Sequence, residues 1–235
     1  MEDYISHYNK DGKYFDYNRV LSKGRRQVEH RRREAIMYFL KSLKENSLIL
    51  DLGSGSGSLT KLLSEKRFHV IPADLSIDNL KAISSPNCYP VYADGYQLPF
   101  QDNCFDAVIL SSVLEHCKEP IDMLKESKRV LSSNGIIISV TPFNENILYH
   151  QCVHCNKLTP SYAHLHSFNE NKLTSLFERC KLDILRVYKF ANITLDVTRS
   201  NLLLKYFSFP IWMIIDSIVN RIIPRQEFIL IAARK

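Results

Sequence analysis

Three glycines stand within five residues, in the run DLGSGSG that extends from Asp51 to Gly57. A turn of this composition lets backbone N–H groups approach a ligand closely, and the N-terminus of a following helix favours electronegative groups. The run lacks the Gly-Lys-Ser/Thr of a P-loop, and Ser58 stands where a nicotinamide-binding G-x-G-x-x-G has its third glycine. The pattern therefore indicates a ligand-binding turn of another kind. The alternative is a turn that only connects two elements.

Two further acidic residues follow apolar runs that read as strands. Asp74 lies at the end of the second run and Asp94 follows the third. Carboxylates there can accept hydrogen bonds from ribose hydroxyls and from the exocyclic amine of adenine, and Asp51 can face an ammonium group. A ligand with an amine, a ribose, an adenine and no phosphate is S-adenosylmethionine. Each acid taken alone could instead be a turn residue or a helix cap.

The elements that position these residues alternate along the chain. We expect strands at 48–50, 69–75, 88–93, 105–111 and 135–140, and helices at 58–66, 77–83 and 120–131. Such alternation means parallel strands with helices on both faces and a ligand at the carboxyl edge. A helix at 169–179 and strands at 182–190 and 228–233 follow, and we expect them to close the sheet as an antiparallel hairpin. The predicted fold is α/β, a Rossmann-like three-layer sandwich with a mostly parallel seven-stranded sheet and an antiparallel last strand.

The stretch from Leu48 to Pro142 resembles class I S-adenosylmethionine-dependent methyltransferases, in the broad small-molecule group often called type 11. The resemblance rests on LILDLGSGSG, VIPADLS, YADGYQLPFQDNCFDAVILSSVLEH and RVLSSNGIIISVTP. The donor-binding residues that it implies are Asp51, Gly53, Ser54, Gly55, Gly57, Asp74, Leu75, Asp94, Gly95 and Ser111.

By position, the resemblance places Asp51 at the methionine end of the donor, Asp74 at its ribose and Asp94 at its adenine. Ser111 would lie beneath the sulfonium. The expected function is methyl transfer to a small-molecule or lipid-linked acceptor, at oxygen or nitrogen. Because the donor carries its own leaving group, proximity and orientation supply much of the acceleration.

His116 is the candidate general base, in the sequence Leu-Glu-His just past the fourth strand. Similar methyltransferases often carry Glu-His at this position, beside the donor. A base is needed only if the acceptor arrives protonated. A histidine that packs or hydrogen-bonds locally is the alternative interpretation.

A loop rich in cysteine and histidine spans residues 150–166. Cys152 and Cys155 have the spacing of a zinc knuckle, and His164 and His166 follow at a distance that permits coordination. We predict a structural zinc ion held by Cys152, Cys155 and His164, with His166 or His150 as the fourth ligand. The alternatives are an unligated loop, a redox pair, or a histidine of this loop that faces the acceptor.

We expect the chain to consist of an N-terminal segment at 1–46 and a methyltransferase domain at 47–235. Residues 1–46 form an N-terminal arm and helix that we expect on the acceptor side or as a lid, with its basic run at 31–33 facing solvent. The methyltransferase domain contains the loop at 150–166 and an apolar insert at 195–225. Within the insert, the stretch 202–223 reads as a lid over the pocket or a face for a partner subunit. An interfacial helix that makes peripheral membrane contact is the alternative.

Composition narrows the partners. The 235 residues carry a net charge of +6, and Asp/Asn-Pro-Pro-aromatic does not follow the fourth strand, so a nucleic-acid substrate is disfavoured. The polar N-terminal residues and the six scattered cysteines favour a cytoplasmic, reducing compartment. We expect a monomer or a homodimer. Two other functions stay open: a non-catalytic donor-binding scaffold that presents the Cys/His loop to a protein partner, and a nicotinamide oxidoreductase, which lacks a Tyr-x-x-x-Lys here.

Overall fold

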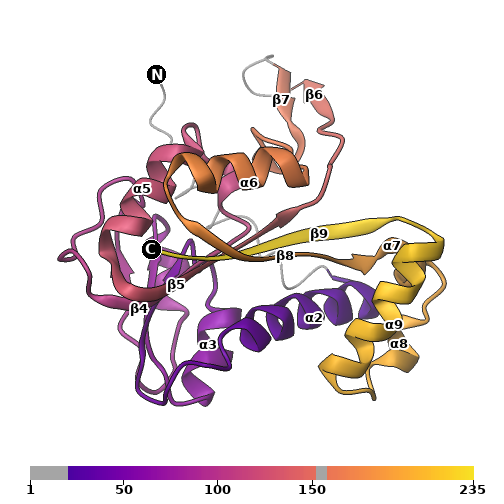
Figure 1. The fold of residues 1–235 in the computed structure, drawn as a ribbon, viewed down its shortest axis with the longest axis horizontal. Helices are drawn as coiled ribbons and strands as arrows, with labels where there is room; N and C mark the ends of the chain where they lie inside the picture. Colours follow the sequence, from indigo (N-terminus) through magenta and orange to yellow (C-terminus); the bar gives the residue numbers. More distant parts are fainter. Residues whose placement is uncertain (1–20, 152–157) are drawn as a thin grey trace.

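A seven-stranded sheet forms the centre of the computed structural model, which describes residues 21–151 and 158–235 (Figure 1). Its strands are β1 (Leu48–Leu52), β2 (His69–Asp74), β3 (Val91–Tyr92), β4 (Phe105–Ser111), β5 (Leu131–Pro142), β8 (Asp183–Asn192) and β9 (Gln226–Arg234). They run in the order β3-β2-β1-β4-β5-β9-β8. The first five are parallel, and β9 is antiparallel to both of its neighbours. The predicted fold class is therefore confirmed.

Helices cover both faces of this sheet. They are α2 (Lys23–Phe39), α3 (Ser58–Glu65), α4 (Ile77–Lys81), α5 (Pro120–Val130), α6 (Glu170–Arg179), α7 (Ile193–Val197), α8 (Asn201–Leu204) and α9 (Phe209–Ile222). Short 3-10 turns, η1 (Leu114–His116) and η2 (Ser161–Ala163), and a separate pair of strands, β6 (Tyr149–Gln151) and β7 (Leu158–Pro160), complete the described part. Figure 1 shows α5 and α6 on one face, and α2 and α3 on the other.

Alternation along β4 shows how the sheet supplies two cores. Val108 and Leu110 pack into the cluster that contains the α5 and α6 side chains, whereas Ala107 and Ile109 pack into the cluster beneath α2 and α3. All four side chains are fully buried. Burial on both faces is what a parallel strand with crossovers above and below requires. The strand order reverses between β1 and β4, and ligands of open α/β sheets bind at such a switch point.

The segment between β8 and β9 is fixed to the sheet by a buried carboxylate. Asp216 of α9 is fully buried and accepts hydrogen bonds from the backbone N–H groups of Ala191 at 3.1 Å and Asn192 at 2.8 Å. The Asn220 amide donates to the same carboxylate at 2.9 Å. Burial raises the pKa of Asp216 to about 6, and these hydrogen bonds counteract the rise.

The prediction that the basic run at 31–33 faces solvent is wrong. Arg31 is 1% exposed, and its Nη2 donates to the backbone carbonyls of Leu204 at 2.6 Å and Phe207 at 2.9 Å. Its guanidinium also lies 5.3 Å from the Trp212 ring centre. The physical reason is that the end of α8 leaves backbone carbonyls without helical partners, and a long cationic side chain from α2 satisfies them.

The structure also corrects the expected lid. Residues 201–223 do not border the cavity described below; α8 and α9 pack instead against α2 and β8. One side of α9 buries Trp212, while the other exposes a row of isoleucines at helical spacing: Ile211, Ile214, Ile218 and Ile222. Among the described residues, no helix combines the length and the apolar character that crossing a membrane requires.

Candidate active site

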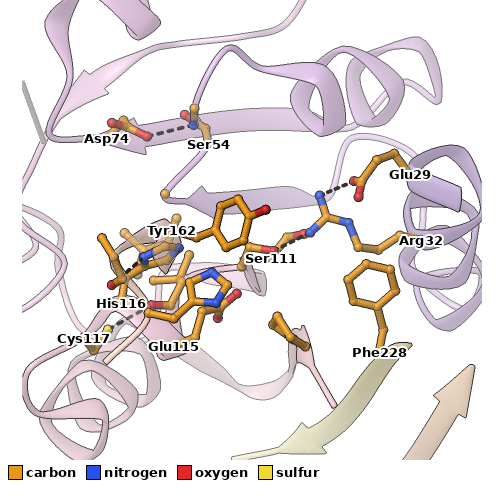
Figure 2. A pocket seen from close by; sticks show the side chains of 18 of the residues that line it. Glu29, Arg32, Ser54, Asp74, Ser111, Glu115, His116, Cys117, Tyr162 and Phe228 are labelled. Atoms are coloured by element: carbon orange, nitrogen blue, oxygen red, sulfur yellow. Dashed lines mark hydrogen bonds and ion pairs between the residues drawn. The ribbon is translucent and has the colours of Figure 1, made fainter. Parts of the chain in front are cut away.

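A cavity of about 1630 Å³ opens at the carboxyl ends of β1, β2 and β4. The loops after these strands form one end of it. The other end is bordered by α2, by parts of the segment 142–165 and by the start of β9. Figure 2 shows side chains from both ends directed into the same space.

The glycine turn after β1 forms the floor of the first end. Gly53, Gly55 and Gly57 all have positive φ, at 70°, 52° and 78°. A Cβ at Gly53 would come within 2.6 Å of Val113, whereas a Cβ at Gly55 would meet no atom within 4 Å. The backbone at Gly55 therefore faces open space. Beside it, the buried Ser54 hydroxyl has no hydrogen-bond partner among the described residues, so the turn offers both an open cradle and a polar group for a ligand.

Asp74 holds this turn in place (Figure 2). Its carboxylate accepts hydrogen bonds from the backbone N–H groups of Gly55 at 2.7 Å and Ser76 at 2.8 Å. Burial raises the pKa of Asp74, and these backbone hydrogen bonds counteract the rise. Since a carboxylate has about four acceptor positions, Asp74 retains capacity for ligand hydroxyls.

Two predicted donor residues do not border the cavity. Asp51 is 2% exposed and accepts a hydrogen bond from the Thr60 hydroxyl at 2.6 Å, behind the turn. Burial raises its pKa to about 6, with a further contribution from the charge of Asp74. Gly57 caps α3 and packs on Ile83. The residues that do border the cavity are Gly53, Ser54, Gly55, Asp74, Leu75, Asp94, Gly95 and Ser111.

The turn after β3 borders the cavity through Asp94 and Gly95. The Asp94 carboxylate accepts a hydrogen bond from the Tyr96 N–H at 3.0 Å, which fixes the turn. A Cβ at Gly95 would lie 2.6 Å from the Met123 sulfur, so a larger residue there would require the end of the Met123 side chain to move. The cavity wall here is backbone with the Met123 side chain beside it.

Arg32 of α2 reaches the opposite end of the cavity, and the sequence analysis missed it. Its guanidinium pairs with Glu29 at 2.6 Å, donates a hydrogen bond to the Ser112 hydroxyl and lies 5.5 Å from the centre of the Phe228 ring. Figure 2 shows Arg32 between Glu29 and Phe228. Arg32 lies about 100° around the helix from Arg31, but the burial of Arg31 is known only from the structure, so no local sequence signal could have located Arg32.

His116 lies at the same end, on η1. Its Nδ1 is 3.3 Å from the backbone carbonyl oxygen of Ala163, and its ring meets that of His164 edge to face, with 4.7 Å between centres. His164 Nδ1 in turn lies 2.5 Å from a carboxylate oxygen of Glu145. The structure therefore brings His116 and His164 together at the cavity, which agrees with the alternative that a histidine of the Cys/His loop faces the acceptor.

The predicted zinc ligands are only partly described. Cys152 and Cys155 lie outside the described residues. His166 Nε2 is 2.8 Å from the carbonyl oxygen of Cys117 and does not border the cavity, whereas His164 does. The two histidines therefore have different surroundings, and the zinc site of the Cys/His loop stays a prediction.

Glu115 is a further group that the sequence analysis did not single out. Its side chain is 1% exposed, and neither carboxylate oxygen has a hydrogen-bond partner among the described residues. Burial raises its pKa to about 7, while Arg32 and Ser112 lie close enough to counteract the rise. Burial of a carboxylate that has no hydrogen-bond partner is unfavourable in free energy.

The seven-stranded sheet, its strand order and the glycine turn together define a class I methyltransferase fold. Residues 50–139 match a family described as "Methyltransferase domain". Residues 50–139 are therefore similar to a methyltransferase domain, and the sheet around them has the fold of class I methyltransferases.

Known proteins share this domain and fold. The chain is 34% identical over 125 residues to a demethylmenaquinone methyltransferase of Corynebacterium urealyticum, which covers 53% of each chain. It is 34% identical over 106 residues to a malonyl-[acyl-carrier protein] O-methyltransferase of Marinomonas, which covers 42% of this chain and 39% of that one. The chain thus spans about half or less of these relatives. An S-adenosylmethionine-dependent methyltransferase from Mesorhizobium loti has the same fold, with a TM-score of 0.62 and 16% identity over 88% of this chain and 98% of that chain.

Proposed function

We propose that this protein transfers the methyl group of S-adenosylmethionine to a small-molecule or lipid-linked acceptor, at oxygen or nitrogen. The observation that carries the proposal is the single cavity with two different ends. One end is bordered by the glycine turn and by acids at strand ends. The other presents cationic, aromatic and imidazole groups from Arg32, Phe228, Tyr162 and His116.

At the donor end, the chain binds through positions that the family resemblance implies. The Gly53–Gly55 backbone and the Ser54 hydroxyl would meet the polar part of the donor, Asp74 the ribose, and Asp94 with Gly95 the adenine. The bound donor supplies an activated methyl group together with its leaving group. The work of the protein is to hold the acceptor atom in line with it, which is a contribution of proximity and orientation.

At the acceptor end, the side chains fit a polar group carried on a flat or apolar body. Arg32 lies over the Phe228 ring, and its charge suits an acceptor oxygen. His116 is the candidate base: when its Nδ1–H donates to the Ala163 carbonyl, Nε2 is the basic nitrogen. The relatives named for demethylmenaquinone and malonyl-[acyl-carrier protein] support an acceptor of small or carrier-linked type.

The exposed isoleucines of α9 support a lipid-linked acceptor and peripheral membrane contact through 202–223. The same isoleucines could contact a partner subunit, so the choice between a monomer and a homodimer stays a prediction. The cytoplasmic location also stays a prediction. The match of residues 50–139 to a methyltransferase domain argues against a nicotinamide-dependent enzyme.

The test has two stages. Calorimetry with S-adenosylhomocysteine and with NAD should show binding of the first only, and tight binding of NAD would overturn the proposal. A screen of acceptor pools with radiolabelled methyl donor should then yield a labelled small molecule. Binding of S-adenosylhomocysteine with no labelled product from any pool would support the donor-binding scaffold instead.

A further inference from the structure

Glu115, His116 and His164 converge at the acceptor end of the cavity. Each offers one ligand atom, and these three atoms all lie within 4.8 Å of one another. We propose that the three side chains bind a divalent transition-metal ion there. The site shares His164 with the predicted zinc knuckle but differs from it in its other ligands, because it uses no cysteine and its carboxylate lies on η1.

The buried carboxylate is the first argument. Glu115 is 1% exposed, and both of its oxygens lack a hydrogen-bond partner among the described residues. The nearby Arg32 pairs with Glu29 and donates a hydrogen bond to the Ser112 hydroxyl instead. Arg32 and Ser112 offset only part of the cost of burying this carboxylate, because its pKa is still raised, and a metal ion would be a further partner for it.

The orientation of the two imidazoles is the second argument. His164 Nδ1 lies 2.5 Å from Glu145, and His116 Nδ1 lies 3.3 Å from the Ala163 carbonyl oxygen. Histidines that ligate metals usually donate their other ring N–H to a carboxylate or a backbone carbonyl, which fixes the ring and the tautomer. In both residues this arrangement makes Nε2 the coordinating nitrogen.

Backbone pairing fixes the site before any ion arrives. The Glu115 carbonyl accepts hydrogen bonds from the N–H groups of both Leu165, at 2.7 Å, and His166, at 3.1 Å. His166 also bonds the Cys117 carbonyl at 2.8 Å. These contacts hold the segment with His164 against η1, so the three ligands come from two segments that are fastened to each other on both sides of the site.

The donor set identifies the class of ion. Two imidazole nitrogens and one carboxylate suit Zn²⁺, Fe²⁺ or Mn²⁺, whereas Mg²⁺ and Ca²⁺ prefer oxygen ligands. Three protein ligands leave coordination positions open, and all three residues border the cavity.

An open coordination position on the ion would allow it to bind the acceptor, a role that rests on the proposed function. An acceptor hydroxyl bound to the ion would lose its proton to bulk water at a lower pH than in solution. Its oxygen would then form the bond to the methyl carbon as the carbon–sulfur bond breaks. His116 would in that case be a ligand rather than the base.

The experiment measures metal binding without an acceptor. The full chain is stripped with a chelator, and Zn²⁺ is then titrated by calorimetry in the presence of saturating S-adenosylhomocysteine. We expect one site whose affinity falls by about 100-fold or more in His164→Ala and Glu115→Gln. It should fall by about 10-fold to 100-fold in Glu145→Gln, which removes only the charge that orients His164. His30→Ala, on the exposed side of α2, is the matched control and should bind as the wild type does.

A Cys152→Ser/Cys155→Ser variant separates this site from the zinc knuckle. Retention of the site in that variant supports the proposal. Its loss there, together with retention in Glu115→Gln, would assign the ion to the knuckle and overturn the proposal, because His164 is a ligand in both arrangements. Absence of Zn²⁺ binding in the wild type would also overturn it. Unchanged affinity for S-adenosylhomocysteine in each variant shows that the fold is intact. A wild type that binds Zn²⁺ but not S-adenosylhomocysteine would leave the metal site standing while the proposed function fails.

Discussion

The two ends of the cavity are built in different ways. The donor end comes from strand ends and the turns directly after them, and much of its surface is backbone at Gly53, Gly55 and Gly95. The acceptor end comes from α2, η1, the segment 142–165 and the start of β9, and its surface is side chains. The donor end therefore follows from the geometry of a parallel sheet, whereas the acceptor end depends on how distant segments pack. The acceptor end can change while the donor end stays the same.

The acidic side chains at the two ends of the cavity also differ in their hydrogen-bond partners. The two acids of the donor end are engaged, Asp74 by two backbone N–H groups and Asp94 by Tyr96, and Asp51 behind it is engaged by Thr60. At the acceptor end, Glu115 is buried without such a partner. The donor end is thus organised before binding. The acceptor end contains a buried carboxyl group whose burial is only partly offset by Arg32 and Ser112.

Replacing Asp74 by alanine is the largest expected effect at the donor end. The change removes the acceptor that holds the Gly55 N–H and also the predicted ribose partner, two charge-assisted hydrogen bonds or more. We expect the affinity for S-adenosylhomocysteine to fall by about 100-fold or more, measured by calorimetry.

The control for this prediction is Asp183→Ala, which removes an exposed carboxylate from the edge strand β8. It should leave the affinity for S-adenosylhomocysteine unchanged. Equal affinities of Asp74→Ala and the wild type would contradict the view that the donor end depends on this carboxylate.

Replacing Arg32 by alanine should separate the two ends. Its loss frees Glu29 and Ser112 and exposes the Phe228 ring, all on the acceptor side. With an acceptor from the screen, we expect kcat/KM to fall by about 30-fold, which is about 2 kcal/mol. The affinity for S-adenosylhomocysteine should change by less than about threefold, well under 1 kcal/mol. Arg26→Ala, exposed on the same helix, is the control. A parallel loss of donor affinity would show that the ends are not independent.

The donor end could be predicted from the sequence because each of its parts is local. A glycine run after a strand and single acids at strand ends converge in any parallel α/β sheet, and the structure gathers Gly53, Asp74 and Asp94 at one edge. The exception is Asp51, which spacing placed at the ligand. Its side chain turns behind the glycine turn because Thr60 of the next helix offers it a hydrogen bond.

The acceptor end could not be predicted because it depends on tertiary packing. The basic run at 31–33 looks like a solvated helix face, yet Arg31 is buried by the carbonyls of a segment about 170 residues away. The apolar stretch 202–223 looks like a lid, yet its apolar side covers β8 and α2. Neither partner is visible in a local window. The nearness of Glu115 to His164 likewise depends on backbone hydrogen bonds between segments far apart in sequence.

The free energy of unfolding should depend on pH through two buried carboxyl groups, one behind the donor end and one in α9. Burial raises the pKa of Asp51, behind the donor end, and of Asp216, in α9, to about 6 in each case. Each group therefore contributes stability that is full below its ordinary pKa near 4 and is lost as pH rises through 6. We expect the free energy of unfolding in urea to fall by between about 1 and 2 kcal/mol per group from pH 4.5 to 7.5.

Asp51→Asn and Asp216→Asn should each remove one share of this slope. Asp216→Asn should also lower stability at every pH, because one amide oxygen cannot accept all the hydrogen bonds from Ala191, Asn192 and Asn220. A slope in both variants equal to that of the wild type would rule out these carboxyl groups as its source.

The smallest expected effect on stability belongs to the exposed face of α9. Ile214 and Ile218 are 60% and 53% exposed, on the side opposite the buried Trp212 and Asp216. The double change Ile214→Ser/Ile218→Ser should alter the free energy of unfolding by less than about 1 kcal/mol, since surface changes away from packed groups have little effect. Deleting 202–223 would be uninformative because it removes buried side chains as well. If this face contacts membranes, the wild type floats with lipid vesicles and the double variant does not. A wild type that does not float but elutes as a dimer, together with a monomeric variant, would assign the face to a partner subunit and leave the acceptor end without a membrane route.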